Sequence, residues 1–273
     1  MPGHTSAAIA SYPWLGSTND TIQVPTTFGK HYAVLNVTHP KVISFLQDLI
    51  DEMLELFETD VIHIGGDEVR FTQWEQNEAI TRYKKEQGFT SYMDIQIDFT
   101  NKLSKYIASK NSRMLGWNEI LGNYQHKDDN IQFDNPTQKL ASNVIVHFWV
   151  GNEAAIIDAA KQGYSILNSH SNYTYLDYNY NAISLQKAYS FNPVPNNLPL
   201  EYTDNILGLG CQMWGEWIPT VASMQQQIYP RITAYAETGW TEQAVKDYEH
   251  FLKRLEYVKR RWKLRGINVY EKK

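Results

Sequence analysis

Five short apolar runs, mostly separated by amphipathic helical patterns, organise this chain of 273 residues. The runs are apolar on both faces, as expected of parallel strands that are covered by helices. The pattern predicts an α/β protein, built either as a (β/α)8 barrel or as an open, doubly wound sheet. The predicted strands are VIHI (61–64), RMLGWNEI (113–120), VIVHFW (144–149), YSILNS (164–169) and ILGLGCQMWGEW (206–217).

Helical patterns lie between and after these runs. Residues 38–57 predict a helix that Thr38 caps and that carries Pro40 in its first turn. Further helices are expected over 91–109 and 152–163 and near the C-terminus. The apolar face of the first helix is Val42, Phe45, Leu46, Leu49, Ile50, Met53 and Leu54, and that of the last is Val245, Tyr248, Phe251, Leu252, Leu255, Val258 and Trp262.

The side chains at the ends of the predicted strands favour the barrel. The carboxyl ends of all barrel strands meet at one mouth, where active sites lie, whereas an open sheet would distribute them along an edge. No Gly-x-Gly-x-x-Gly turn or phosphate-binding loop follows any strand. The strand ends carry Asp67 and Glu68, then Trp117 and Glu119, then Trp149, then the Tyr-rich loop after Ser169, then Trp214 and Glu216.

Five strands are fewer than the eight that a closed barrel needs. We therefore expect residues 1–273 to form a partial barrel, corresponding to strands 4–8 with their helices. The segment MPGHTSAAIA at the N-terminus has no charged stretch before an apolar core, so it is not expected to be a signal peptide.

Charge and composition narrow the possible partners. The net charge is −5 and no long basic run occurs, so nucleic acid and anionic membrane surfaces are not expected partners. Cys211 is the single cysteine, which excludes an intrachain disulfide, and no Cys/His cluster suggests a metal site. No stretch approaches the roughly 18 consecutive apolar residues of a membrane span.

The segment VIHIGGDEV places two carboxylates, Asp67 and Glu68, directly after a strand and two glycines. One interpretation is structural, because acidic residues are favoured at the start of a helix. The other is chemical: a carboxyl group near another carboxylate, in a partly apolar pocket, has a raised pKa and can donate a proton near neutral pH.

Aromatic residues favour the chemical interpretation. Trp117, Trp149 and Trp214 each lie near a strand end, where a barrel would direct them toward one mouth and where they could wall a sugar pocket. The loop NYTYLDYNY (172–180) adds hydroxyl groups and the carboxylate of Asp177. These groups could bind a polar ligand, although the loop could also pack on itself.

The sequence resembles the catalytic domain of glycoside hydrolase family 20, the β-N-acetylhexosaminidases. The resemblance rests on seven segments that occur in the family's order from residue 1 almost to the C-terminus. They are MPGHTSAA, HIGGDEV, LGWNEIL, VHFWVG, TYLDY, CQMWGEW and YPRITAYAETGW. The resemblance implies hydrolysis of terminal β-linked N-acetylglucosamine or N-acetylgalactosamine with retention, a carbohydrate substrate, no cofactor and no metal.

The resemblance also implies a role for each matching residue. Glu68 would be the general acid/base, Asp67 would orient the substrate's acetamido group, and Tyr175 would bind its carbonyl. The remaining residues implied are substrate contacts: His4 beside the acid, Trp117, Trp149 and Trp214 around the N-acetyl group and ring, and Asp177 and Glu216 at sugar hydroxyls. The family is substrate-assisted, so the nucleophile would be the substrate's own acetamido oxygen.

In the family, the segment MPGH follows the third barrel strand. The resemblance therefore implies that a small N-terminal domain and three strands are absent from these residues, together with an arginine for the outer hydroxyls and an aspartate that supports His4. Either a longer chain or another chain, as in a homo-oligomer, would supply them. Export from the cell is expected by family resemblance. N-x-Thr sequons begin at Asn19, Asn36 and Asn172. A glycan on Asn172 would crowd Tyr175, which favours a bacterial over a eukaryotic secretory origin.

Three other functions are compatible with parts of the pattern. A metal-dependent barrel hydrolase could use His63, Asp67, Glu68 and His147, although the spacings H-x-H and H-E-x-x-H do not occur. A non-catalytic sugar-binding derivative would not need the Asp67–Glu68 pair. A family 18 chitinase would need a D-x-x-D-x-D-x-E signature, which the strand ending at Asp67–Glu68 does not have.

Overall fold

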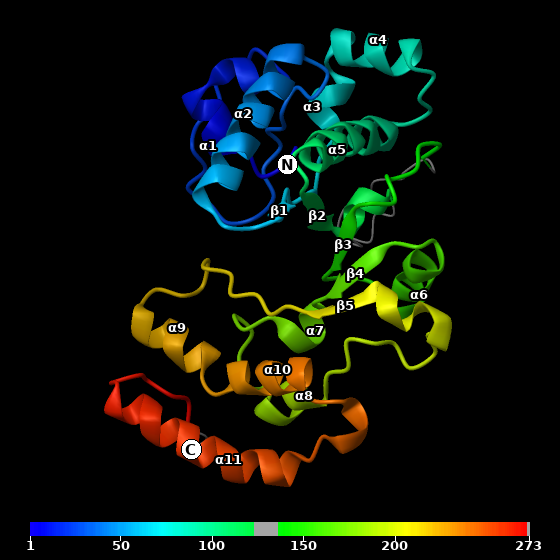
Figure 1. The fold of residues 1–273 in the computed structure, drawn as a ribbon. Coiled ribbons are helices and arrows are strands. Elements are labelled where there is room, and N and C mark those ends of the chain that lie inside the picture. Colours follow the sequence, from blue (N-terminus) through cyan, green and yellow to red (C-terminus); the bar gives the residue numbers. More distant parts are fainter. Residues whose placement is uncertain (123–135, 272–273) are drawn as a thin grey trace. The chain divides into compact units, whose positions relative to one another are not determined.

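The computed structural model describes residues 1–122 and 136–271. These residues contain five parallel strands in the order β1-β2-β3-β4-β5, which is also their order in the sequence. Helical segments separate the strands along the chain, so the architecture is α/β, as predicted (Figure 1). The chain divides into two compact units, Met1–His147 and Phe148–Lys273, and each is described by itself below.

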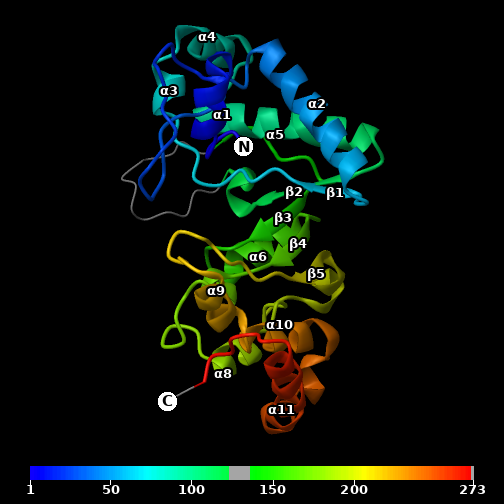
Figure 2. The same cartoon turned by 90° about the vertical axis from the view of Figure 1, so that its left-hand side faces the viewer.

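The first unit is built around β1 (Val61–His63), β2 (Arg113–Trp117) and most of β3 (Ile145–Phe148). Val61 pairs with Arg113, and Leu115 pairs with Ile145, both in parallel register. Two long helices, α2 (Pro40–Leu56) and α5 (Tyr92–Ser109), lie on one side of β1 and β2 (Figure 1, Figure 2). The shorter segments are α1 (Ser6–Ser11), η1 (Pro13–Leu15), α3 (Thr72–Glu75), α4 (Glu78–Glu86) and η2 (Asn118–Leu121).

The second unit contains β4 (Ser165–Asn168) and β5 (Ile206–Leu209), which pair in parallel with a register shift between Ile166 and Leu167. The backbone N–H of Ser169 donates to the carbonyl of Phe148, at 2.7 Å, at the end of β3. Its helices are α6 (Glu153–Lys161), α7 (Ser171–Thr174), α8 (Leu185–Ser190), η3 (Leu200–Asn205), α9 (Val221–Ile228), α10 (Arg231–Trp240), η4 (Gln243–Val245) and α11 (Tyr248–Leu264).

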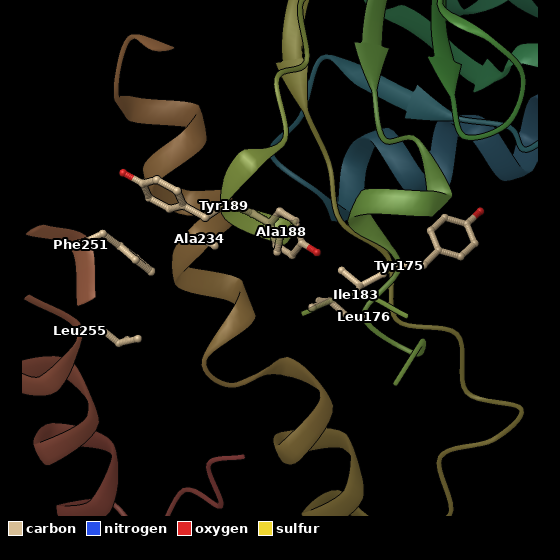
Figure 3. Packing of buried hydrophobic residues seen from close by; sticks show 9 residues of the cluster. Tyr175, Leu176, Ile183, Ala188, Tyr189, Ala234, Phe251 and Leu255 are labelled. Carbon is tan, nitrogen blue, oxygen red and sulfur yellow. The ribbon is translucent and has the colours of Figure 1, made fainter. Parts of the chain in front are cut away.

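A hydrophobic cluster holds the helices of the second unit together. Phe251 and Leu255 of α11 pack toward Ala234 and Tyr235 of α10, and the cluster extends to Tyr175 (Figure 3). Tyr175 lies at the far end of this cluster, with its ring directed away from Ala234 and Phe251. The cluster therefore anchors Tyr175, to which the resemblance assigns the acetamido carbonyl.

Several predicted boundaries were wrong. His39 rather than Thr38 caps α2: its Nδ1 accepts from the backbone N–H of Lys41 at 3.1 Å, while Thr38 Oγ1 donates to Asn36. β2 ends at Trp117, because residues 118–121 turn into η2, and β5 ends at Leu209 rather than at residue 217. Val245 belongs to η4, and α11 begins only at Tyr248, after an Asp247 cap.

Within the described residues, no helix is both long enough and apolar enough to cross a membrane.

Candidate active site

The turn that follows β1 places Asp67 and Glu68. Gly65 and Gly66 have φ values of +76° and +101°, and Glu68 itself has a φ of +53°. A Cβ atom on Gly66 would lie 2.3 Å from Ile120 Cγ2, so this position accepts only glycine without a shift. A left-handed conformation at a non-glycine residue costs about 1–3 kcal/mol and is found where the surrounding structure imposes it. Such strain at Glu68 is typical of a functional position.

Neighbouring elements hold this turn in place. The backbone N–H of Trp117 donates to the carbonyl of Gly65 at 2.8 Å, which continues the β1–β2 pairing past the end of β1. The buried side chain of Gln96, on α5, donates from Nε2 to the carbonyl of Gly66 at 2.8 Å. The two bonds join the turn to a strand and a long helix, which are rigid supports for the two carboxylates.

His4 joins the two carboxylates. Its Nε2 lies 3.3 Å from Asp67 Oδ2 and 3.3 Å from Glu68 Oε2. The hydrogen bonds to Asp67 and then to Glu68 raise the pKa of His4 to about 10, so the imidazole is protonated at neutral pH. The positive charge between Asp67 and Glu68 reduces their mutual repulsion, which explains how the chain tolerates adjacent carboxylates there.

Lys30 adds a second cation to the same cluster. Its Nζ lies 3.5 Å from Glu68 Oε1, and the side chains of Lys30 and Glu68 are each 17% exposed. The two oxygens of Glu68 therefore face different cations, His4 and Lys30. The sequence analysis did not select Lys30, because it lies in a loop before α2 and belongs to no recognisable motif.

The ring of Trp117 packs against the side chains of His63 and His147. It stacks on His147 with centroids 4.2 Å apart and lies 4.7 Å from the His63 ring. The backbone N–H of Gly65 donates to His63 Nδ1 at 2.9 Å, which leaves the proton of neutral His63 on Nε2, 3.1 Å from His147 Nδ1. Burial lowers the pKa of His147 to about 3, so this pair stays uncharged at neutral pH.

The second unit brings together a different set of predicted residues. Tyr175 lies between two tryptophans: its ring is 6.1 Å from Trp149 and nearly parallel to it, and 6.1 Å from the ring of Trp214. The backbone fixes this position, because Leu176 N–H donates to the carbonyl of Gln212 at 2.7 Å. Tyr175 is 6% exposed, whereas Trp214 is 38% exposed.

Asp177 lies in the same loop as Tyr175. Its Oδ1 is buried and has no hydrogen-bond partner among the described residues. The pKa of Asp177 is raised above its usual value, chiefly by burial and also by the nearby charge of Glu216. Hydrogen bonds from the backbone N–H groups of Asp177 and Trp214 lower this pKa but do not outweigh burial. Glu216 itself is exposed. A buried acceptor without a partner is suited to a ligand hydroxyl.

The predicted site residues thus fall into two groups, one in each unit. His4, Asp67, Glu68 and Trp117 belong to the first unit. Trp149, Tyr175, Asp177, Trp214 and Glu216 belong to the second. Within each unit the structure brings predicted residues into contact, the first as a charged cluster and the second as an aromatic one with a carboxylate.

The metal-site alternative does not match the geometry. His63 and His147 bond to each other, whereas the described His, Cys, Asp and Glu ligand atoms within 4.8 Å of one another belong to His4, Asp67 and Glu68. The ligand set of the metal alternative, with His63 and His147 beside Asp67 and Glu68, is therefore not the group that the described residues bring together.

Comparison with known proteins agrees with the motifs. The family model described as glycosyl hydrolase family 20, catalytic domain, matches residues 1–243. The chain belongs to glycosyl hydrolase family 20. The family resemblance predicted from the sequence is thereby confirmed.

Among family 20 relatives, the β-hexosaminidase of Porphyromonas gingivalis is 29% identical to this chain over 281 residues, covering 99% of the chain and 34% of the relative. The β-hexosaminidase of Vibrio furnissii is also 29% identical, covering 88% of the chain and 39% of the relative. The chain therefore spans between a third and two fifths of the length of these two relatives.

Solved family 20 structures share the fold. The exo β-N-acetylglucosaminidase of Vibrio harveyi, solved in complex with N-acetylglucosamine, superposes with a TM-score of 0.82 at 28% identity. The match covers 99% of this chain and 42% of that one. The chitobiase of Flavobacterium johnsoniae gives a TM-score of 0.81 at 29% identity over 98% of this chain and 39% of that one. The prediction of an incomplete TIM barrel is in agreement with these likenesses.

Proposed function

We propose that the protein containing this chain hydrolyses terminal, non-reducing β-linked N-acetylglucosamine or N-acetylgalactosamine. The observation that carries the proposal is the Asp67–Glu68 pair, held by one protonated histidine at the end of a strand, in a chain of this family. The P. gingivalis relative is named a β-hexosaminidase, and the V. harveyi structure holds N-acetylglucosamine. Both names support the same substrate class.

Glu68 is the proposed general acid. In the first step it donates a proton to the glycosidic oxygen while the substrate's acetamido oxygen attacks the anomeric carbon. The leaving sugar departs with that proton, and an oxazolinium ion remains. Glu68, now ionised, then removes a proton from water as the water opens this ring. Two inversions at the anomeric carbon give net retention.

Asp67 is the proposed partner of the acetamido group. Positive charge develops on the acetamido nitrogen as the ring closes, and an ionised carboxylate held in place stabilises it. The protonated His4 pairs with Asp67, with its Nε2 3.3 Å from Asp67 Oδ2. Glu68 has to cycle between its neutral and ionised forms, so the two neighbouring carboxylates have different tasks.

The proposed role of the second group is to shape the pocket. Tyr175 would donate its hydroxyl to the acetamido carbonyl, and Trp149 and Trp214 would provide aromatic walls for the N-acetyl group. Asp177, with its buried unpaired oxygen, and Glu216 would accept hydrogen bonds from sugar hydroxyls.

Replacing Glu68 by Gln tests this function. Since general acid catalysis is worth about 10²–10⁴-fold, we expect a loss of that order in the cleavage of N,N′-diacetylchitobiose. An aryl N-acetylglucosaminide with a good leaving group should lose less, because its departure needs less protonation. Substrate binding, measured by calorimetry, should be largely kept. Wild-type cleavage of the disaccharide by Glu68→Gln would exclude Glu68 as the acid.

A non-catalytic sugar-binding derivative is the second candidate. It predicts calorimetric binding of N-acetylglucosamine without turnover of either substrate by the wild-type protein, so the same measurements separate the two functions.

A further inference from the structure

Lys30 is a charged neighbour of Glu68 that the proposed mechanism leaves without a task. Its ammonium lies 3.5 Å from Glu68 Oε1, on the oxygen that does not face His4. The Lys30 side chain is 17% exposed, so part of its hydration has been exchanged for this contact. Long lysine side chains usually keep the ammonium in water, and burial beside one carboxylate indicates a positioned group.

The loop that carries Lys30, residues 17–34, is tied together at its base. Gly16 and Leu35 form an antiparallel bridge, and Ser17 Oγ donates to the carbonyl of Val34 at 2.9 Å. The backbone N–H of Val34 also donates to Gln73 Oε1 at 3.1 Å. The loop connects η1 to α2 in the sequence and is drawn in blue in Figure 2. A closed loop with paired ends can hold a side chain in a fixed place.

The tip of the loop turns at Gly29, which has a φ of +105°, and Lys30 follows directly. Two residues later, the Tyr32 ring lies under the guanidinium of Arg70, 4.8 Å from its centroid. Arg70 follows Glu68 closely in the chain, so this contact fastens the loop beside the catalytic turn. The Tyr32–Arg70 contact therefore helps to hold Lys30 close to Glu68.

The surroundings of Lys30 change when Glu68 acts as an acid. His4 and Lys30 each place a positive charge beside Glu68. When Glu68 is protonated, as the first step requires, it no longer offers these cations a carboxylate. An anion on the leaving sugar could then pair with the Lys30 ammonium in its place.

Glu68 delivers its proton to the glycosidic oxygen, so its immediate neighbours border the leaving group. We propose that Lys30 forms a leaving-group subsite for sugars that carry an anion, either a uronic acid carboxylate or a sulfate ester. This inference rests on the proposed function and specifies its substrate class. An anionic leaving sugar can pair with the Lys30 ammonium when Glu68 is protonated, an interaction that a neutral sugar does not offer.

Matched disaccharides test the subsite in the protein that contains this chain. N-acetylglucosamine is linked β-1,4 to glucuronate, to 6-O-sulfoglucose or to glucose, and kcat/KM is measured for each. We expect the two anionic substrates to be preferred over the glucose compound by roughly 3- to 30-fold at low salt, the range of partly exposed charge pairs. The preference should shrink at high salt because exposed charges are screened.

Variants separate charge recognition from a structural effect. Lys30→Met should remove the preference, Lys30→Arg should keep it and Lys30→Glu should reverse it. The matched control is Lys41→Met. Lys41 is on α2, where its ammonium lies over the Trp14 ring, so this variant should leave the preference unchanged.

A wild-type ratio of anionic to neutral substrate near one, or a ratio that Lys30→Met leaves unchanged, overturns the inference alone. No cleavage of any of the three compounds overturns the proposed function and the inference together. A preference for only one of the two anionic substrates shows whether Lys30 recognises the carboxylate or the sulfate ester.

Discussion

Asp67 and Glu68 are adjacent in the sequence but have different surroundings. Both contact His4, while only Glu68 also contacts Lys30, and only Glu68 adopts the left-handed conformation. In a regular extended strand, neighbouring side chains point to opposite faces. The positive φ values of Gly65, Gly66 and Glu68 break this alternation, so both carboxylates reach the same imidazole.

Asp67→Asn tests whether this residue supports the acetamido group. The variant keeps the shape and loses the charge that stabilises the oxazolinium, so we expect kcat to fall by about 10²–10³-fold. Binding of a thiazoline mimic of the cyclised intermediate should weaken more than binding of the product sugar, because transition-state-like ligands depend most on such groups. Equal weakening of both ligands, or efficient cleavage of glucosides without a 2-acetamido group, would contradict substrate assistance.

Tyr175→Phe tests the other proposed contact of that group. Only the hydroxyl is lost, and the ring keeps its place beside Trp149, so the fold should be unaffected. We expect kcat/KM for N-acetylglucosaminides to fall about 10- to 100-fold, the cost of losing one hydrogen bond to a developing charge. Tyr173→Phe is the matched control, since that ring stacks on Phe191 in the same loop region. A comparable loss in the control would assign the effect to loop packing.

Sequence reasoning predicted some of the individual residues that the structure brings together in the candidate site. It selected His4, Asp67 and Glu68, which the structure joins through two ion pairs, and Trp149, Tyr175 and Trp214, which lie ring against ring. It assigned His63 and His147 to a metal alternative, whereas they form a neutral pair under Trp117. Lys30 could not be predicted, because its approach to Glu68 depends on how a long loop closes in space.

At the level of elements, helix α5 supports the turn that carries Asp67 and Glu68. Gln96, in its first turns, bonds the carbonyl of Gly66, and the start of the helix is fixed by Asp94. Asp94 is fully buried, and its Oδ2 accepts from the backbone and hydroxyl groups of Thr90 and Ser91. Its Oδ1 accepts from the backbone N–H groups of Thr137 and Gln138 at 2.6 and 2.8 Å. One carboxylate thus caps α5 and fastens residues 137–138 to it.

The titration of Asp94 gives a stability prediction. Burial raises its pKa, but the hydrogen bonds from Gln138 and Ser91 outweigh burial and lower the pKa to about 2. The unfolded chain has an ordinary aspartate pKa near 3.9, so the folded state is favoured by about 2–3 kcal/mol above that pH. This stability should be lost as the pH falls from about 4 to about 2. Urea unfolding at a series of pH values measures it.

Asp94→Asn should remove this acid-dependent contribution and cost about 3 kcal/mol at neutral pH, because the amide cannot accept all the bonds to a buried carboxylate. Asp98→Asn is the control on the same helix, where the carboxylate binds Lys102 at 2.7 Å near the surface. It should cost less than about 1 kcal/mol. Equal losses in the two variants would show that Asp94 is not a special support of α5.

Elements were predictable where local chemistry defines their ends. Ser91 and Asp94 form a capping box, and α5 begins directly after Ser91, as the predicted range of 91–109 indicated. The apolar runs also marked β1 and β3 to within a residue or two. The runs at 113–120 and 206–217 predicted strands that were too long, because apolar and aromatic side chains continue past the last paired residue into a 3-10 turn and a loop.

At the scale of the whole molecule, the relatives are longer than this chain. It covers 39% and 42% of the chains in the two superposed structures and 34% of the P. gingivalis relative. The described residues supply five strands, whereas a closed barrel has eight. We propose that a complete catalytic barrel needs further strands, as the resemblance implied.

Residues 1–273 alone should therefore associate with themselves and show little N-acetylglucosaminidase activity. β1 and β5 are the outer strands of the parallel sheet, and Leu207 of β5 is 53% exposed. Parallel sheets are normally covered on both faces, and unpaired edges with apolar side chains recruit other chains. A chain extended by the coding sequence upstream of Met1, or mixed with that segment as a separate piece, should become monodisperse and active. Size-exclusion chromatography and an aryl N-acetylglucosaminide assay on both forms measure this. A monomeric 273-residue chain with the full activity of the extended form would show that five strands suffice for the pocket, and that the proposed further strands contribute no catalytic group.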